Sequence, residues 1–423
     1  MSKKGSIWRK CDLHVHTPLD HEWINKPDIS SEENKLAFAN EFVAFAESQG
    51  LEMIAVTDHN FCNHVDDLIL PHIIKAGIEK SITVLPGFEV TVKDGSGIHI
   101  LVVFKENSCL SSIHEIVKRL FPLGTELVPS SGYVPVSDKE LDELKEILDE
   151  AGLEYLLIFA HADRSSGVLN RGTIDGTRRI QEWTKPYVNI CQLSKSTEDF
   201  KTCFISKVIN KTDSNYSRDI TYIVASDCRA ISKDAIEEGR HHLGQKFTWI
   251  KCDPTLEGLR QIVHEPKSRV RIQEEKPEQK SAYLTIDSVR FISKNDTFPI
   301  DSIEVNSNLN SIIGGKSSGK SLLLYYIAKT IDAKQVTQRL KEMGFGDEPY
   351  DFQKEADFDF EVHWSDGEIN RLNDGLERKR QITYIPQMYI NHVAEHRGDK
   401  ELDKLVKSIL NETMVSIKDH CLK

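Results

Sequence analysis

The sequence predicts an α/β protein with two domains, a barrel of parallel strands followed by a phosphate-loop domain. Three observations predict this fold class. Short apolar runs typical of buried strands alternate with helical stretches across residues 1–273. Histidine and acidic side chains adjoin the ends of these strands, as they do at the mouth of a β/α barrel. A glycine-rich phosphate-loop motif follows later, between a predicted strand and a predicted helix.

The composition narrows the class of protein. The chain has 423 residues, which is long enough for two or three domains. No apolar run reaches the roughly 18 residues of a membrane span, the first residues lack the apolar core of a secretion signal, and the eight cysteines form no Cys-x-x-Cys pair. We therefore expect a cytoplasmic protein with reduced thiols and no membrane partner. The net charge of -12 argues against a globally basic nucleic-acid wrapper but leaves room for a local basic groove.

The first chemical motif is the run Asp12-Leu13-His14-Val15-His16-Thr17. On a strand, Asp12, His14 and His16 would share one face, because successive side chains alternate. Imidazole is the commonest metal ligand, and a neighbouring carboxylate can bind or orient the ion. This spacing favours a metal site, although a single His-x-His also fits a strand whose histidines face solvent.

Later stretches repeat this arrangement. Residues 32–49 predict an amphipathic helix, and residues 138–151 predict another. The apolar run 53–56 predicts a strand that leads into Asp58 and His59. Further predicted strands adjoin one metal-type residue each. They are 84–88 beside Glu89, 100–104 beside His99, 156–160 beside His161 and 222–226 beside Asp227.

These motifs, in this order, resemble the polymerase and histidinol phosphatase (PHP) domain. The resemblance implies a distorted (β/α)7 PHP barrel that holds two or three divalent metals. It implies that a first metal is bound by His14, His16, Glu89 and Asp227. It also implies that Glu89 bridges to a second metal held by His99 and His161. Asp58 and His59 complete the expected metal-binding residues, and a third metal would be held by His59 with His21 or Asp20.

The last motif departs from the family pattern, because Arg229 stands where many relatives have a histidine. A guanidinium is permanently protonated and cannot bind a metal, so the third metal is left open. Arginine matches phosphate oxygens in a bidentate way. We therefore expect Arg229 to contact a substrate phosphate and to act in catalysis with His14, His16, Glu89 and Asp227.

The expected ligands predict a class of reaction. Two cations held together can lower the pKa of a bound water and clamp the attacking and leaving oxygens of a displacement at phosphorus. The residues therefore predict phosphoester hydrolysis. Mixed imidazole and carboxylate ligation suits zinc, manganese or iron better than an all-oxygen magnesium or calcium shell.

The second domain is predicted over 281–423, after a polar, proline-broken linker at 274–280. The run Gly314-Gly315-Lys316-Ser317-Ser318-Gly319-Lys320-Ser321 satisfies the phosphate-loop pattern in full, with a predicted strand at 309–313 and a predicted helix at 322–329. Backbone N–H groups of this loop would cradle the phosphates of ATP. Lys320 would reach the β and γ phosphates, and Ser321 would bind magnesium.

Other features of this domain resemble the head of ABC-type ATPases, including SMC-like DNA proteins. Strand-rich stretches at 283–291 and 300–305 precede the loop, and a predicted strand at 381–387 delivers Gln387 at the position of the family's magnesium-sensing glutamine. The family's signature segment and acidic strand are not found before Lys423. We therefore expect the N-terminal part of a longer ATPase, with a helical insertion beginning in 399–410. The resemblance implies a homo-oligomer formed through head dimerisation.

The two domains together resemble bacterial PHP–ATPase fusions, the TrlF-like and polymerase/histidinol-phosphatase-like (Ppl) antiphage defence proteins. The resemblance implies defence against phage through attack on nucleic acid or nucleotides. Three functions stay open: a metal-dependent nuclease that acts on nucleic acid such as DNA under ATP regulation, a phosphatase acting on nucleotides or small phosphorylated metabolites, and a metal-free scaffold that binds ATP.

A basic loop after His161 bears on this choice. It carries Arg164, Arg171, Arg178 and Arg179, which would either follow a phosphate backbone or be simply solvated. The histidines outside the motifs, including the pair at 241 and 242, are assigned to surface or packing roles.

Overall fold

The structure is a computed structural model of the chain, and it divides into two compact units. The first unit spans Gly5–Glu278, and the second spans Gln279–Lys423 together with Ser2–Lys4. Among the residues that the structure describes, no helix is long and apolar enough to cross a membrane. The described residues are 4–130, 133–233, 240–278, 280–294, 298–299, 301–345, 349–350, 352, 357–374, 380–387, 389–397, 400, 403 and 406–407.

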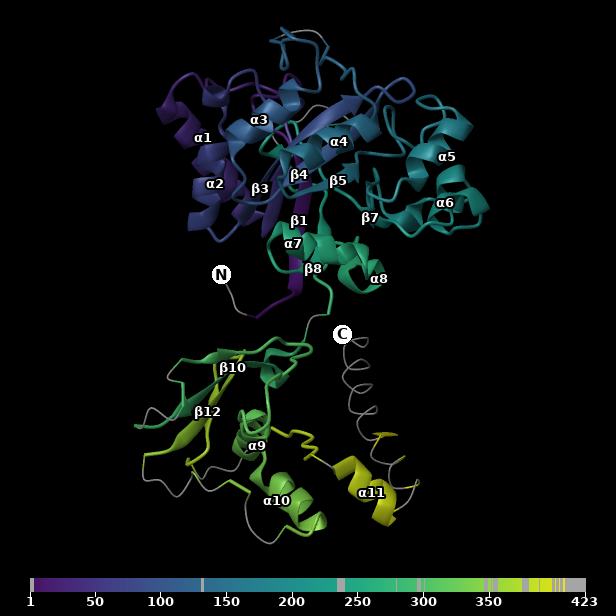
Figure 1. The fold of residues 1–423 in the computed structure, drawn as a ribbon. Helices are drawn as coiled ribbons and strands as arrows, with labels where there is room; N and C mark the ends of the chain where they lie inside the picture. The colour runs from purple at the N-terminus through teal and green to yellow at the C-terminus, as the bar shows by residue number, and fades with distance from the viewer. Residues whose placement is uncertain are drawn as a thin grey trace. The chain divides into compact units, whose positions relative to one another are not determined.

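The first unit is built on one curled, mixed sheet. Its strands are β1 (Ile7–Val15), β2 (Met53–Val56), β3 (Thr83–Val92), β4 (Ile98–Phe104), β5 (Tyr155–Phe159), β6 (Ile190–Gln192), β7 (Thr221–Ile223), β8 (Thr248–Cys252) and β9 (Val270–Arg271). They lie in the order β7-β6-β5-β4-β3-β2-β1-β8-β9, and the end strands β7 and β9 come close together, so the sheet nearly closes into a barrel (Figure 1). The hydroxyl of Thr248 fastens this closure, because it accepts from the N–H of Val224 (2.9 Å) and donates to its carbonyl (2.7 Å).

The prediction that all strands run parallel is wrong. Strands β1, β2 and β3 are parallel, and so are β5, β6 and β7, but β4 is antiparallel to both of its neighbours and β8 is antiparallel to β1. The connection 93–97 between β3 and β4 is too short for a crossover helix. Gly95 (φ 65°) and Gly97 (φ 105°) supply the left-handed backbone of this tight turn. The reversal places His99, the second residue of β4, beside Glu89 of β3.

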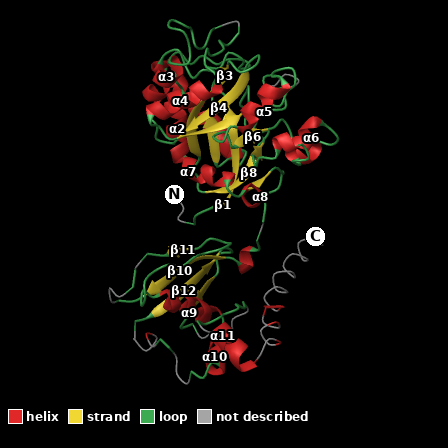
Figure 2. Cartoon of the chain, turned by 45° about the vertical axis from the view of Figure 1, so that its right-hand side comes forward, coloured by secondary structure: helices red, strands yellow, loops and turns green. Residues whose placement is uncertain are grey.

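Helices cover the outside of the sheet (Figures 1 and 2). They are α1 (Glu32–Ser48), α2 (Leu70–Glu79), α3 (Leu110–Lys118), α4 (Leu141–Ala151), α5 (Gly176–Thr184), α6 (Phe204–Ile209), α7 (Leu256–Arg260) and α8 (Pro266–Arg269). The predicted helices at 32–49 and 138–151 correspond to α1 and α4. Apolar side chains such as Phe42 and Val56 form an outer core beneath the helices, and Leu13 and Leu101 belong to an inner core between the strands. Leu256 of α7 joins the inner core, so α7 closes the barrel end where β1 begins.

An irregularity in β1 decides where its side chains point. Leu13 belongs to the inner core and Val15 to the outer core, although an unbroken strand would place both on one face. The register of β1 against β2 shifts between Asp12 and Val15. Asp12 therefore does not share a face with His14 and His16, contrary to the sequence expectation.

The second unit contains an antiparallel sheet and three helices among its described residues. These elements are β10 (Ile286–Ile292), β11 (Ile303–Glu304), β12 (Asp359–Trp364), β13 (Ile369–Arg371), α9 (Lys320–Ile331), α10 (Ala333–Glu342) and α11 (Tyr389–Arg397). The strand order is β11-β10-β12-β13. Aromatic side chains fill the core, and the ring of Phe291 lies 4.8 Å from that of Phe360. Strands β10 and β11 and helix α9 correspond to the predictions at 283–291, 300–305 and 322–329.

Two strands predicted in the second unit are not formed. Residues 309–313 are irregular, and Leu309 and Ile313 are 83% and 91% exposed. Residues 381–387 are irregular as well. An apolar run becomes a strand when a neighbouring strand satisfies its backbone, and within the described part of the chain neither run has such a neighbour. The helical insertion predicted in 399–410 falls mostly outside the described residues.

Candidate metal centre

Metal-type side chains converge at the barrel mouth opposite α7. Parallel strands bring their C-terminal ends to one edge, and the antiparallel β4 brings its N-terminal end to the same edge. The mouth therefore collects most of the residues that the sequence singled out as ligands. They are His14, His16, His59, Glu89, His99, His161 and Asp227.

Glu89 stands at the centre of this group, and its carboxylate is fully buried. Its oxygen Oε2 faces three imidazoles, and Oε1 faces two others. Oε2 lies 2.9 Å from Nε2 of His14, 3.2 Å from Nε2 of His59 and 3.5 Å from Nε2 of His16, whereas Oε1 lies 2.6 Å from Nδ1 of His99 and 3.2 Å from Nε2 of His161. One carboxylate is thus divided between two sets of imidazoles, which is the arrangement of a ligand that bridges two cations.

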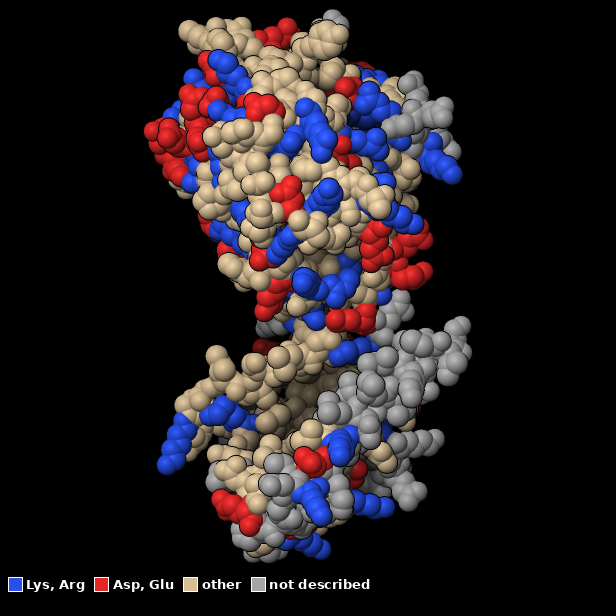
Figure 3. Space-filling model, turned by 90° about the vertical axis from the view of Figure 1, so that its right-hand side faces the viewer, with Lys and Arg blue, Asp and Glu red and all other residues tan. Residues whose placement is uncertain are grey.

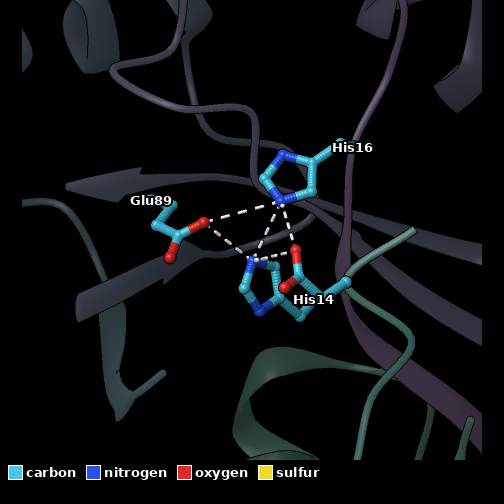
Figure 4. Close-up of side chains that lie close together, drawn as sticks. His14, His16 and Glu89 are labelled. Atoms are coloured by element: carbon cyan, nitrogen blue, oxygen red, sulfur yellow. Dashed lines mark hydrogen bonds and ion pairs between the residues drawn. The ribbon is translucent and has the colours of Figure 1, made fainter. Parts of the chain in front are cut away.

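The first candidate metal site joins His14, His16, Glu89 and Asp227. Figure 4 shows His14, His16 and Glu89 pointing toward one another. Nε2 of His16 lies 3.0 Å from Nε2 of His14 and 3.1 Å from Oδ1 of Asp227. The ligand atoms all lie within 4.8 Å of one another, so a single ion could contact every one of them.

The hydrogen bonding of His14 tests whether a cation fits this site. Oε1 of Gln192 accepts from the backbone N–H of His161 (3.2 Å) and lies 2.8 Å from Nδ1 of His14, which must therefore carry a proton. Nε2 of a neutral His14 then has only a lone pair, and it lies 2.9 Å from a carboxylate oxygen of Glu89. Two lone pairs at this distance repel unless a proton or a cation lies between them. The donor set therefore fits a metal ion, and Gln192 orients the ring that would bind it.

Two further groups share residues with the first. One joins His16, Asp20 and His59, and the other joins His59, Glu89 and His99. Asp20 is fully buried, and its Oδ2 lies 3.0 Å from Nδ1 of His16 and 2.6 Å from Nδ1 of His59. Of the two residues that the sequence left undecided, His21 and Asp20, it is Asp20 that belongs to one of these groups.

Two other sequence candidates stand outside these groups. Nδ1 of His21 lies 3.5 Å from Oδ1 of Asp20, and His21 belongs to none of the metal-type groups found among the described residues. Asp58 is likewise in none of them. Its carboxylate accepts from the backbone N–H (2.6 Å) and the hydroxyl (2.7 Å) of Thr17, so both of its oxygens are engaged in holding the loop after β1.

Asp12, the first acid of the motif, fastens strand ends. Its buried carboxylate accepts from the N–H groups of Ser226 (2.9 Å) and Gly244 (3.0 Å). Burial raises its pKa to about 6, although these hydrogen bonds act in the opposite direction. Asp12 thereby ties β1 to the segment that carries Asp227.

Arg229 is buried beside the candidate ligands and is only 4% exposed. Its Nη2 lies 2.9 Å from Oδ1 of Asp227, and its Nε donates to Oε2 of Glu22 (2.9 Å). Two acids therefore engage the guanidinium. The geometry gives Arg229 a hold on Asp227, and its expected contact with a substrate phosphate stays a prediction.

Two residues of the centre have unusual backbone angles. His161 (φ 23°) and Asp227 (φ 50°) are non-glycine residues at positive φ, just beyond β5 and β7. Such conformations cost about 1–3 kcal/mol each and cluster at functional sites. The surrounding barrel therefore holds both side chains in place against local backbone preference.

The buried charges shift one another's pKa values. Burial would raise the pKa of Glu89, but His59 and His14 lower it well below its usual range. Burial would lower the pKa of His14, but Glu89 and Asp227 outweigh burial and raise it. The pKa of His99 is lowered, because burial dominates there. The acids are thus ionised and ready to bind a cation, which would displace protons from the imidazoles.

A basic cavity of about 280 Å³ opens beside the metal centre. His161 and Asp227 form its border with the candidate ligands. Nζ of Lys246 donates to the carbonyl of Ser194 (2.7 Å), and burial lowers the pKa of this lysine. The other cationic or titratable residues of the lining are Arg164, Arg240 and His241.

The phosphate-loop residues form an exposed turn before α9. Ser317 (φ 63°) and Gly319 (φ 87°) give the turn its left-handed corners. Nζ of Lys320 donates to the carbonyls of Gly314 (2.8 Å) and Gly315 (2.6 Å), so the lysine folds back onto its own loop. The other residues predicted to bind ATP do not form a closed pocket within the described part of the chain. Lys316, Ser318, Ser321 and Gln387 are exposed, and the Ser318 hydroxyl lies 3.5 Å from the Lys320 ammonium.

Some residues of the site do not follow from the sequence motifs. Gln192 belongs to no motif and ends β6, a strand of only three residues; the one signal for it is the mainly apolar stretch 187–193. His241, which the sequence assigns to a surface or packing role, lines the basic cavity. Its neighbour His242 fits that assignment, since its Nδ1 donates to the Leu243 carbonyl (2.9 Å).

No protein-family model matches the chain, and no curated protein matches it. One similar solved structure is PsfC from Pseudomonas syringae PB-5123, at 14% identity and a TM-score of 0.31 over 58% of this chain and 83% of that chain. Another is a two-domain protein from Bacteroides vulgatus that contains a predicted PHP-like metal-dependent phosphoesterase, at 13% identity and a TM-score of 0.38 over 72% of this chain and 86% of that chain. Both TM-scores are too low to establish a shared fold.

Proposed function

We propose that the barrel is a metal-dependent phosphoesterase that hydrolyses nucleic-acid phosphodiesters. The single observation that carries this proposal is the division of the Glu89 carboxylate between two sets of imidazoles, with a further acid on the first set. Shared carboxylates of this kind hold paired metals in phosphatases and nucleases. Imidazole and carboxylate donors suit manganese, zinc or iron.

Each residue has a task in this proposal. His14, His16, Glu89 and Asp227 would hold one cation, and Glu89 and His99 with His59 or His161 would hold a second. When bound, two such cations acidify water and stabilise the charge that develops on phosphoryl oxygens. Gln192 keeps Nε2 of His14 directed at the centre, and Arg229 keeps Asp227 in position.

The basic cavity supports a phosphoester substrate. Arg164 and Lys246 offer positive charge within the same cavity that Asp227 borders, so a phosphate held there would lie next to the candidate ligands. The lining contains no Phe, Tyr or Trp among the described residues. Recognition through charge without base stacking favours a backbone over a particular base. A phosphatase acting on nucleotides or small phosphorylated metabolites is the second candidate, because the volume of the cavity is small.

We further propose that ATP with magnesium binds the phosphate loop and regulates the barrel, and that the second unit mediates homo-oligomer formation. The motif and its position before α9 support this proposal. A role in antiphage defence follows from the resemblance of the two-domain arrangement alone.

The test uses purified full-length protein with manganese and three substrates: a labelled DNA strand, a labelled RNA strand and a panel of mononucleotides. Cleavage of a polynucleotide that is lost in His14→Ala and retained in Lys320→Ala would support the nuclease with separate regulation. Phosphate release from mononucleotides alone would support the phosphatase. Metal content well below one equivalent per chain after manganese loading, together with no hydrolysis, would overturn both and leave the ATP-binding scaffold.

A further inference from the structure

A second cavity lies on the side of the barrel unit where α5 and α6 are found. It has a volume of about 470 Å³, and its cationic lining residues are Arg171, Arg179 and Lys207. None of its lining residues is a candidate metal ligand or lines the basic cavity beside Asp227. Figure 3 views this side of the molecule and shows Lys and Arg side chains spread over it among uncharged and acidic residues. The cavity is thus a positively charged feature that the hydrolytic centre does not use.

Two guanidinium groups are held together in this cavity by one aromatic ring. The guanidinium carbon of Arg171 lies 5.0 Å from the ring centroid of Phe204, and that of Arg179 lies 4.9 Å from the same centroid. Like charges repel, so their placement on one ring is stabilised when an anion lies between or beside them. Because the ring is already covered by guanidinium groups, it is a poor platform for a nucleic-acid base.

Hydrogen-bond donors in the cavity remain unused. Arg179 is 8% exposed, and its Nε donates to the hydroxyl of Tyr216 (2.9 Å) while its Nη1 donates to the carbonyl of Ile174 (3.3 Å). Its Nη2 has no hydrogen-bond partner among the described residues and lies toward Gly176, where an added Cβ would come within 3.7 Å of it. Gly176 also begins α5, whose N-terminus is capped by Asp175, since the carboxylate of Asp175 accepts from the N–H of Arg178 (3.0 Å).

The lining contains one acid, Asp213, beside its three cations. Oδ1 of Asp213 accepts from the N–H (3.1 Å) and the side-chain amide (3.1 Å) of Asn215. Arg178 lies between the lining residues Thr177 and Arg179 in sequence, but it pairs with Asp94 and Glu140 and is not part of the lining. Within the described part of the chain, neither Arg171 nor Lys207 has an ion-pair partner. The cavity therefore keeps an excess of positive charge.

A single loop links this cavity to the metal centre. Arg164 lines the cavity beside Asp227, and Arg171 lines the second cavity. The two residues are seven positions apart in sequence, and an extended chain spans at most about 3.6 Å per position, so their Cα atoms lie within about 25 Å of each other. At about 3.4 Å of rise per nucleotide, this corresponds to at most about seven nucleotides of a stacked strand.

We propose that this second cavity, formed by Arg171, Arg179 and Lys207 beside the start of α5, binds a backbone phosphate of a polynucleotide whose scissile phosphodiester lies at the metal centre. The proposal rests on the proposed function and makes it narrower, because a mononucleotide could not occupy both places. Guanidinium groups pair with phosphate oxygens in a bidentate way and carry no base preference, so the site fixes the strand without reading its sequence.

The test measures binding of a fluorescein-labelled single strand of twelve nucleotides to full-length protein without added metal, over a series of salt concentrations. The double variant Arg171→Ala, Lys207→Ala removes two exposed cations, and Lys75→Ala removes an exposed cation from α2 on the opposite side of the unit (Figure 1). Each lost phosphate contact lowers the slope of log affinity against log salt by about 0.7 for a single strand. We expect the double variant to bind several-fold more weakly, with a shallower salt slope and equally for different base sequences, whereas Lys75→Ala keeps the slope of the parent.

The same proteins are then assayed for manganese-dependent hydrolysis of the twelve-nucleotide strand and of bis(p-nitrophenyl) phosphate, which has a single phosphate. We expect the double variant to lose kcat/KM for the strand relative to kcat/KM for the small ester. Unchanged binding and an unchanged ratio would overturn the second phosphate site while the proposed hydrolase stands. Absence of hydrolysis by the parent protein together with weakened strand binding in the double variant would instead remove the hydrolase and keep the binding site. A strand bound no more tightly than AMP, or no binding at all, would also overturn the proposal.

Discussion

The two sites that the sequence marks most clearly are built in opposite ways. The ligands at the barrel mouth are buried or half-buried, and within each candidate group the ligand atoms lie within 4.8 Å of one another. The residues of the phosphate loop are largely exposed, and Lys320 is turned onto the carbonyls of Gly314 and Gly315. One site is positioned by strands from across the unit, and the other by a single loop.

This difference shows where each site obtains its geometry. At the barrel mouth the lone pair of His14 already faces a carboxylate, so the protein has created a place that a cation relieves. In the loop the ammonium of Lys320 is satisfied by carbonyl oxygens, so a phosphate would have to replace bonds that already exist. We therefore expect strong, preorganised binding at the barrel and weaker binding that requires rearrangement at the loop.

The largest effect is expected from Glu89→Gln, which breaks the barrel site at its shared ligand. An amide oxygen has no charge to bridge two cations, so we expect loss of the second metal equivalent and a fall in kcat of about a thousandfold or more. Elemental analysis and a manganese-dependent hydrolysis assay measure the two effects. Glu79→Gln, on an exposed residue at the end of α2, is the matched control. A Glu89→Gln protein that retained two metals and its activity would refute the bridging role.

A smaller effect is expected from Gln192→Leu, which removes the acceptor for Nδ1 of His14 without touching a ligand. The ring would then be free to change tautomer or rotate, and loss of such an orienting partner usually costs about 10- to 100-fold in metal affinity. Gln192→Glu keeps the acceptor and should bind metal at least as tightly as the parent. Competition titration with a metal chelator gives both affinities. Equal affinity for the Leu and Glu variants would show that the hydrogen bond does not orient His14.

The same contrast explains what the sequence could and could not predict. His14, His16, Glu89, His99, His161 and Asp227 could be proposed in advance, because each lies beside an apolar run and the ends of such runs meet at a barrel mouth. The direction of β4 could not, since it depends on the short turn 93–97. The separation of Asp12 from the two histidines could not be predicted either, because it depends on a register shift of β1 against β2 that the sequence of β1 alone does not indicate.

The second unit shows the opposite kind of failure. The phosphate-loop pattern and α9 are local, and the sequence predicts both. The runs at 309–313 and 381–387 have the apolar character of strands, but a strand also needs a neighbour, and pairing is a property of the whole sheet. The roles of Gln192 and Asp20 could not be predicted for a related reason. Gln192 acts through a contact with His14, which is distant in sequence, and Asp20 acts through contacts with His16 and His59 that depend on how the loop after β1 folds.

Ligand-dependent unfolding should separate the two sites. Manganese at a hundred times its dissociation constant should stabilise the barrel unit by about 2.7 kcal/mol, and ATP with magnesium should act on the second unit only. Differential scanning calorimetry on the full chain would follow the transition of each unit. We expect His14→Ala to lose the manganese shift and keep the ATP shift, and Lys320→Ala to do the reverse. Loss of both shifts in either variant would contradict independent sites.

The smallest effect concerns Glu361, a buried carboxylate in the second unit that resembles Glu89 in being surrounded by nitrogen-containing side chains. Glu361 is 1% exposed, and Arg290 (2.8 Å), Arg371 (2.9 Å) and His363 (3.0 Å) surround it. Burial would raise its pKa, but these partners outweigh burial and lower it below the ordinary value of 4.5. The two arginine side chains are themselves 42% and 49% exposed, so solvent screening limits the stabilisation to about 1 kcal/mol.

The pH dependence of that stabilisation follows from the direction of the shift. A carboxylate whose pKa is lower in the folded state binds fewer protons there, so its contribution is complete above pH 4.5 and is lost as the pH falls through the lowered folded pKa. Urea unfolding of the second unit at pH 7 and at acidic pH would show this loss in the parent, and Glu361→Gln should be less stable at pH 7 and change less with pH.

Glu361 is satisfied by permanent charges and needs no metal, whereas Glu89 is surrounded by imidazoles alone. Manganese should therefore leave the stability of the second unit unchanged in the parent and in Glu361→Gln. A manganese effect on that unit would contradict the distinction between Glu361, which is already paired, and Glu89, which needs a cation.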